Sequence, residues 1–158
     1  MELRWKEGFF SSKYHLLRED EEVGEMNFKL FSSTEDGLLN SERYLFKRKG
    51  VFNNKVEIIE SESQEVVGEI IYHSLKSEAE VELGEKRYLW KFDNLWSSKW
   101  SLNDGEEALI NYRSKFMKGQ LNSSTENNIL ILSGLHIYSY YLRVFVSLTV
   151  MVIIICSN

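Results

Sequence analysis

The chain contains no proline and only one cysteine, Cys156. Average usage of about 5% would place about eight prolines in a chain of this length. Proline removes a donor from a β-ladder, so its absence is typical of a chain made mostly of paired strands. A single cysteine excludes an internal disulfide framework and a cysteine-rich zinc site. The first residues, Met1 to Glu7, lack the apolar stretch of a signal peptide, so the predicted location is the cytoplasm.

Basic residues do not exceed acidic ones, and the formal net charge is -5. A nucleic-acid-binding domain needs basic density to neutralise phosphates, so no nucleic-acid partner is predicted. The sequence has no glycine-rich phosphate loop, no Gly-x-Ser-x-Gly and no His-Glu-x-x-His. It therefore predicts no cofactor, no metal ion and no catalytic residue.

Charge is almost absent from the segment Ile129 to Cys156, where Arg143 is the one charged residue. Such a segment either crosses a membrane or is buried in the protein's own core. As a helix it would extend about 42 Å, whereas a bilayer core of about 30 Å needs about 20 residues. Arg143 lies near the middle, where a charge costs at least about 2.5–3.5 kcal/mol in a membrane. A helix buried inside a β-barrel is apolar on all sides, so the sequence favours burial.

Other residues of this segment bear on the same choice. The stretch from Thr125 to Asn128 offers N-cap residues, and Ser133 and Gly134 would permit close approach of a strand. Residues 144–156 are rich in β-branched side chains, which favours strand on propensity alone. The alternative interpretation is a β-domain anchored in a membrane by residues 129–156.

The first 125 residues show the alternation of short β-strands. Glu78 to Leu83 places Ala79, Val81 and Leu83 on one face and glutamates on the other, which is typical of a half-buried strand. Similar strands are predicted at Arg43–Phe46, Lys55–Ile59, Val66–Tyr72, Tyr88–Phe92, Lys99–Leu102 and Ala108–Tyr112. The predicted turns include Asp36-Gly37, Gly84, Asp93-Asn94 and Lys118-Gly119.

An internal repeat is suggested by three comparable hairpins. They start at Tyr14, Val56 and Trp100, at spacings of 42 and 44 residues. Chance similarity between strand–turn–strand units is the alternative. A true duplication implies a closed or pseudo-symmetric meander, in which closure removes exposed strand edges.

Three stretches resemble the tubby-like superfamily, which includes the LURP-one-related and phospholipid scramblase-like proteins. They are Tyr88-Leu89-Trp90-Lys91, the stretch from Trp96 to Leu102, and the run from Ile129 to Tyr138. The last is similar to the helix that threads the barrel in that family. The resemblance implies a barrel of about twelve strands around a hydrophobic C-terminal helix, with a binding or scaffolding role. The basic residues with which true tubby domains bind phosphoinositides have no match in the sequence.

The candidate ligand-binding residues are Arg43, Lys47 and Lys49. Strand alternation places them on one face, opposite Tyr44, Phe46 and Arg48. Such a stripe could meet an anionic headgroup or an acidic partner, although a solvated strand face is the simpler explanation.

The remaining polar and aromatic residues each admit a structural explanation. His15, His73 and His136 fall on separate elements, which favours structural histidines over a metal or catalytic site. Glu19–Glu22 and Glu60–Glu65 lack the spacing of a calcium loop and are interpreted as solvated turns. The four tryptophans fit either carbohydrate stacking or the packing of a barrel wall.

The sequence therefore predicts a mainly β fold of one domain. It is a closed antiparallel barrel, with strands in residues 1–125 and a buried apolar helix in residues 126–156. The predicted function is non-catalytic binding or scaffolding of a lipid or protein partner. The first alternative is membrane association through the C-terminus, and the second is an enzyme whose site is built from scattered residues.

Overall fold

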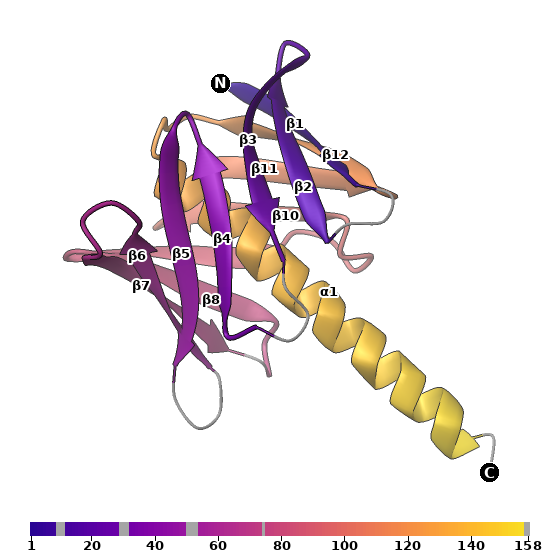
Figure 1. Cartoon of the computed structure of the whole chain (residues 1–158). Coiled ribbons are helices and arrows are strands. Elements are labelled where there is room, and N and C mark those ends of the chain that lie inside the picture. The colour runs from indigo at the N-terminus through magenta and orange to yellow at the C-terminus, as the bar shows by residue number, and fades with distance from the viewer. Residues whose placement is uncertain (9–11, 29–31, 50–53, 74, 157–158) are drawn as a thin grey trace.

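Twelve antiparallel strands form a closed barrel around the first half of one long helix (Figure 1). The computed structural model describes residues 1–8, 12–28, 32–49, 54–73 and 75–156, and helix side chains as far as residue 152. The strands are β1 (Glu2–Glu7), β2 (Lys13–Arg18), β3 (Glu21–Asn27), β4 (Thr34–Leu39), β5 (Glu42–Lys49), β6 (Lys55–Glu60), β7 (Val66–His73), β8 (Glu78–Leu83), β9 (Lys86–Phe92), β10 (Lys99–Asp104), β11 (Glu107–Lys115) and β12 (Lys118–Ser123). The helix is α1 (Asn128–Cys156). The predicted closed barrel with a central C-terminal helix is confirmed.

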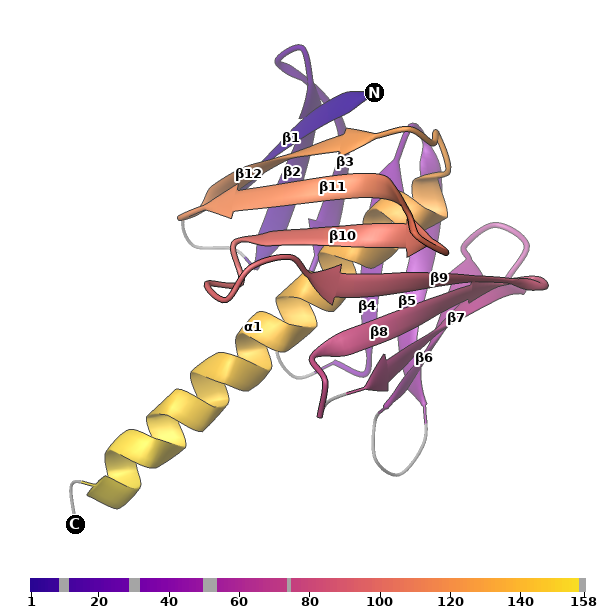
Figure 2. The same ribbon diagram turned by 180° about the vertical axis from the view of Figure 1, so that it is seen from behind.

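The barrel is an up-and-down meander in which every strand pairs with its sequence neighbours. It closes where β1 pairs with β12, with Glu2 opposite Asn122 (Figure 2). Successive connections therefore alternate between the two ends of the barrel. We call the end where α1 begins the entry end, and the end where α1 leaves the barrel the exit end. The exit end carries the connections β1–β2, β3–β4, β5–β6, β7–β8, β9–β10 and β11–β12.

The core lies between the inner face of the barrel and the first half of α1. Strand alternation sends every second side chain inward, and large residues such as Trp90 and Trp100 become fully buried. Trp100 stacks between Tyr112 of β11 and Tyr138 of α1, with ring centroids 5.3 Å and 3.7 Å away. Aromatic stacking thus joins the helix to the barrel wall.

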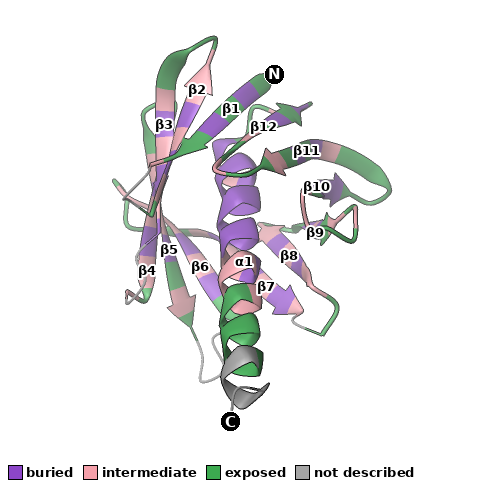
Figure 3. Ribbon diagram, turned by 90° about the vertical axis from the view of Figure 1, so that its right-hand side faces the viewer, coloured by how far each residue is buried: buried purple, intermediate pink, exposed green. Residues whose placement is uncertain are grey.

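The helix starts with a cap and is buried over its first half. Asn127 Oδ1 accepts a hydrogen bond from the backbone N–H of Leu130 at 3.2 Å, as expected for an N-cap. Most residues from Leu130 to Tyr141 are buried, and those from Val146 to Val152 are exposed, so the predicted burial of residues 126–156 holds only for the first half of the helix (Figure 3). The strand propensity of residues 144–156 was misleading, since the helix continues to Cys156.

The predicted close approach at Gly134 is confirmed. A Cβ atom built there would overlap the hydroxyl oxygen of Tyr112, a contact that real Cβ atoms do not adopt. The Tyr112 hydroxyl donates to the carbonyl of Ile131 at 3.1 Å, and the indole N–H of Trp90 donates to the carbonyl of Gly134 at 3.1 Å. The missing side chain therefore lets the barrel wall bond directly to the helix backbone.

Two predicted turns are wrong. Asp36-Gly37 lies within β4, where a Cβ at Gly37 would lie 2.7 Å from the sulfur of Met26. Lys118-Gly119 begins β12, and a Cβ at Gly119 would overlap the ring of Trp5. Both glycines make room for buried side chains, a packing role that resembles a turn signal in sequence.

The three hairpins predicted to be comparable share a structural detail. Tyr14, Val56 and Trp100 are each the second residue of their strand, in β2, β6 and β10. Each of these strands forms an irregular step with the next one, at Leu16/Leu17, Ile58/Ile59 and Leu102/Asn103. The irregularities recur at the same spacing as the hairpins. Descent from one duplicated unit stays a prediction.

Candidate functional site

The helix is fixed at the exit end by a cluster of ionisable residues that we call the mouth cluster: Glu35, Arg48, His136 and Arg143. Glu35 on β4 points inward, and only 2% of its side chain is exposed. Its Oε1 accepts a hydrogen bond from Nη1 of Arg143 at 2.6 Å and lies 3.5 Å from Nη2 of Arg48. Its Oε2 lies 2.9 Å from Nδ1 of His136, at ion-pair distance but without the alignment of a hydrogen bond. The positive charge of Arg143, which disfavours α1 as a membrane-spanning helix, is thus paired with Glu35 at the exit end of the barrel.

Protonation in the mouth cluster follows from burial and from these contacts. Burial alone would raise the pKa of Glu35, but His136 and Arg143 outweigh it and lower that pKa to about 2. Burial lowers the pKa of His136, against the opposing effect of Glu35. At neutral pH the cluster therefore holds an ionised Glu35, two guanidinium groups and a neutral imidazole, which stacks on Phe46 at 4.6 Å.

A cavity of about 600 Å³ opens beside the mouth cluster. Its lining includes Arg48, Tyr140 and Arg143 and, further along α1, Val146 and Leu148. Glu7 also contributes to the wall, and burial raises its pKa. Nη2 of Arg143 is buried without a hydrogen-bond partner among the described residues.

After Phe145, whose ring still packs against Phe92 of β9, the helix projects from the barrel with an apolar surface (Figures 1 and 3). No charged residue follows Arg143 up to Cys156. The exposed large side chains are 50–63% accessible. They are Val146, Leu148, Val150, Met151 and Val152. At about 100° per residue, these positions are distributed around the whole circumference of the helix.

The polar side chains of the projecting part are bonded to its own backbone. The Ser147 hydroxyl donates to the carbonyl of Arg143 at 2.8 Å, and the Thr149 hydroxyl donates to the carbonyl of Phe145 at 2.9 Å. Such bonds to the preceding turn satisfy a hydroxyl without water. Through Val152, the projecting helix therefore presents no side-chain donor or acceptor that needs an external partner.

The loops at the exit end are also apolar at their tips. Leu75, Leu95, Trp96 and Phe116 are 88–104% exposed, and they lie in the β7–β8, β9–β10 and β11–β12 connections. Of the ten large hydrophobic residues exposed in the described part of the chain, only Val66 lies at the entry end. We call these four loop residues together with residues 144–152 of α1 the apolar face.

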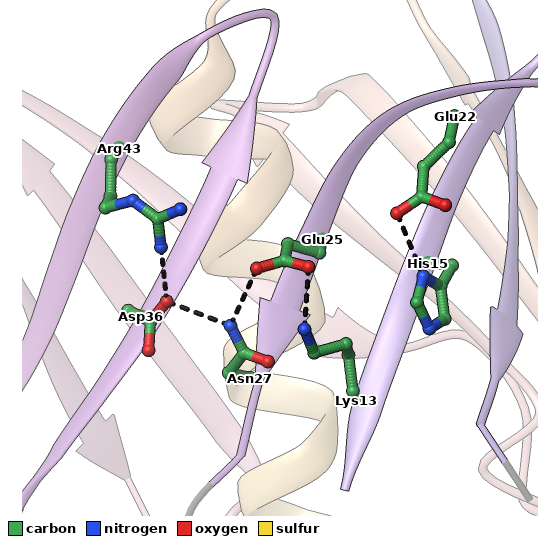
Figure 4. A network of polar contacts seen from close by, with 7 residues as sticks. All are labelled: Lys13, His15, Glu22, Glu25, Asn27, Asp36 and Arg43. Carbon is green, nitrogen blue, oxygen red and sulfur yellow. Dashed lines mark hydrogen bonds and ion pairs between the residues drawn. The ribbon is translucent and has the colours of Figure 1, made fainter. Parts of the chain in front are cut away.

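The predicted stripe lies on the outer wall, away from the mouth cluster. Arg43, Lys47 and Lys49 do share the outer face of β5, as alternation predicts, but two of them are paired. Arg43 bonds to Asp36 at 2.7 Å within a polar network across β2 to β5 (Figure 4), and Lys49 lies 3.0 Å from Glu57. Arg48, on the inner face of the same strand, is the basic residue that joins the mouth cluster. Binding by Arg43, Lys47 and Lys49 stays a prediction.

The histidines occupy three separate environments. His15 lies 2.9 Å from Glu22 and His73 lies 3.2 Å from Glu80, both as partly exposed pairs on the outer wall (Figure 4 shows the first). His136 is buried in the mouth cluster. Among the described residues, no three His, Cys, Asp or Glu side chains come close enough to hold a metal ion.

The tryptophans divide between core and surface. Trp5, Trp90 and Trp100 are at most 2% exposed, as core packing requires, whereas Trp96 is 88% exposed. Sequence reasoning treated all four alike, as core packing or as carbohydrate stacking, and did not single out Trp96. Its neighbour Leu95 in a turn between two strands was the available signal, because large apolar pairs are unusual in turns.

Comparisons with family models, curated proteins and solved structures find no match to this chain.

Proposed function

We propose that the protein is a non-catalytic binding domain of tubby-like type that docks on a lipid bilayer through its apolar face. The observation that carries the proposal is the stretch of α1 from residue 146 to residue 152, which is uncharged and exposes large apolar side chains around the helix. A contiguous exposed apolar surface on a protein marks a site that binds a partner protein or a membrane. A protein groove covers one side of a helix, whereas lipid covers all of it. The internally bonded hydroxyls of Ser147 and Thr149 suit an environment without water.

The location of Arg143 limits how much of the helix enters the bilayer. Residues 130–141 fill the barrel, so residues 129–156 do not serve as a detached anchor while the barrel is folded. Phe145 is the last helix residue that packs against the barrel core, and the helix from residue 146 to residue 156 extends about 16 Å. This exceeds half of a hydrocarbon core of about 30 Å but does not cross it. The helix is therefore proposed to enter one leaflet while the barrel stays outside.

The loop tips fit the same orientation. Trp96 and Leu95 project at the exit end, where an inserted helix would bring them to the headgroup region. Tryptophan favours this interface because its ring is apolar and its N–H is polar. Full burial of a large apolar side chain contributes on the order of 1.5–3 kcal/mol, so several tips add to the attachment.

Vesicles of phosphatidylcholine test the proposal without any contribution from lipid charge. The full chain should float with these vesicles in a density gradient. Val152→Asp should lower the bound fraction, because an acidic residue costs about 2.5–3.5 kcal/mol at the bilayer centre. Val66→Asp is the matched control, since Val66 and Val152 are 54% and 58% exposed but lie at opposite ends. Val66→Asp should bind as the wild type does.

Tryptophan fluorescence gives a second measurement on the same samples. Three tryptophans are already buried, so a blue shift on adding vesicles reports on Trp96. Trp96→Phe should bind vesicles but lose most of the shift. The proposal would be refuted if the wild type did not bind vesicles but dimerised with rising concentration while Val152→Asp stayed monomeric. That result would show that a second copy of the chain covers the helix.

A further inference from the structure

The two ends of the barrel carry opposite charge. At the entry end, the connections and their flanking strand residues contain twelve acidic residues against two basic ones, Arg18 and Lys86. The described connections at the exit end, counted in the same way, contain seven lysines against three acidic residues. The formal net charge of -5 is therefore unevenly distributed between the two ends of the barrel. The exit end, where basic residues predominate, is also the end that carries the apolar face.

Four of the exit-end lysines have no ion-pair partner among the described residues. They are Lys76, Lys99, Lys115 and Lys118, and all four are exposed. The other three, Lys13, Lys49 and Lys55, pair with glutamates of neighbouring strands at 2.7–3.1 Å. We call the four unpaired residues the lysine rim.

The lysine rim and the exposed loop tips occupy the same loops. Lys76 follows Leu75 directly, and Lys115 and Lys118 lie on either side of Phe116. Lys99 closes the loop that contains Leu95 and Trp96. An apolar tip that enters the headgroup region would carry its lysine to the level of the lipid phosphates and carboxylates.

We infer that the apolar face selects anionic over neutral leaflets through the lysine rim. The inference rests on the proposed membrane docking and adds the class of lipid and the orientation of the barrel. Fields from exposed charges decay within about 8 Å at physiological ionic strength, so the lysines closest to the surface dominate over the net charge. The acidic entry end is repelled by the same surface and faces away from it.

The size of the effect follows from the number of lysines that reach the surface. Each basic residue close to an anionic leaflet raises the partition coefficient by about fivefold. Two rim lysines at the surface therefore give a preference of about 25-fold for anionic vesicles, and four give more. The preference falls as salt screens the charges.

The test compares vesicles of phosphatidylcholine alone with vesicles that also contain phosphatidylserine. The full chain should partition more strongly into the second kind, and the ratio of the two partition coefficients should fall with added salt. In the quadruple variant, Lys76, Lys99, Lys115 and Lys118 are each changed to Gln. This variant should lower the ratio of the two partition coefficients by at least about tenfold. Its binding to neutral vesicles should be unchanged, because the apolar face is intact.

The control variant makes the same change in net charge at the entry end. Lys86→Glu with Arg87→Glu also lowers the formal charge by four, and it should retain the preference for phosphatidylserine. Equal losses in both variants would mean that net charge alone governs binding, which would overturn the inference. An unchanged ratio in the quadruple variant would overturn it as well. Absence of any binding to neutral vesicles would instead count against the proposed docking.

Discussion

Glu35 should stabilise the fold by about 3 kcal/mol at neutral pH, and the substitution Glu35→Gln should remove this contribution. The pKa of Glu35 is lowered from 4.5 to about 2 against the effect of burial, by His136 and Arg143. A shift of this size corresponds to about 3 kcal/mol of folding free energy. Removing one partner of a buried pair costs about 3–5 kcal/mol. Arg48 and Arg143 are each 26% exposed and can recruit water, so we expect a loss of about 2–4 kcal/mol.

The dependence on pH separates this contribution from simple loss of packing. A carboxylate with a lowered pKa stabilises the fold above its unfolded pKa of 4.5, and the contribution is lost as the pH falls toward 2. Roughly 2 kcal/mol of it should be gone by pH 3. Glutamine mimics the protonated carboxyl, so the difference between wild type and Glu35→Gln should be largest above pH 5 and should shrink in acid.

Urea unfolding at a series of pH values measures this difference directly. Glu57→Gln is the control, because Glu57 pairs with Lys49 on the outer wall, where such pairs contribute about 0–1 kcal/mol. His136 also destabilises the fold below its unfolded pKa of 6.5, because burial lowers its pKa. This effect is the same in the wild type and Glu57→Gln but larger in Glu35→Gln, which lacks the carboxylate that raises the pKa of His136. A free-energy difference for Glu35→Gln that stays constant from pH 7 to pH 3, or one no larger than that of Glu57→Gln, would refute the reasoning.

Two further predictions concern the helix. Leu132→Asp should abolish cooperative thermal unfolding, because it buries an unpaired charge in the barrel. Val152→Asp should melt as the wild type does, because Val152 is exposed. Similar melting temperatures for the two variants would place the barrel boundary elsewhere. Gly134→Ala should destabilise the fold by about 1–3 kcal/mol in urea unfolding, because the new methyl group overlaps the Tyr112 ring. The neighbouring Ser133→Ala should be neutral or stabilising, since the buried Ser133 hydroxyl has no hydrogen-bond partner among the described residues, and equal costs for the two changes would contradict the packing described.

Sequence patterns were sufficient for the architecture because each strand signals itself locally. The predicted strand Glu78–Leu83 coincides with β8, and the start of β10 is predicted correctly at Lys99. Alternation also placed Arg43, Lys47 and Lys49 on the outer face of β5. It says nothing about which charges meet across strands, so the pairing of Arg43 with Asp36 was not foreseen.

The candidate site depended on contacts between distant parts of the chain. Arg143 reads in sequence as an obstacle to membrane insertion, but its partner Glu35 lies 108 residues away. The charge difference between the two ends of the barrel was easier to predict. In a meander every second turn lies at the same end, and the acidic turns Glu19–Glu22 and Glu60–Glu65 were recognised only as solvated turns. Assigning alternate turns to opposite ends is enough to reveal this difference from the sequence alone.

The threading of α1 through the barrel sets an order of events during synthesis. All twelve strands precede the helix that fills the barrel, and the closing contact from Met1 to Ser123 joins residues 122 positions apart. Until Tyr141 is made, inner side chains such as Trp90 have no core to join. At about 5–20 residues per second, the delay after Ser123 lasts on the order of 1–4 s. A nascent chain stopped in that interval presents its inner surface to chaperones, so the rate of translation through residues 124–141 becomes a determinant of yield.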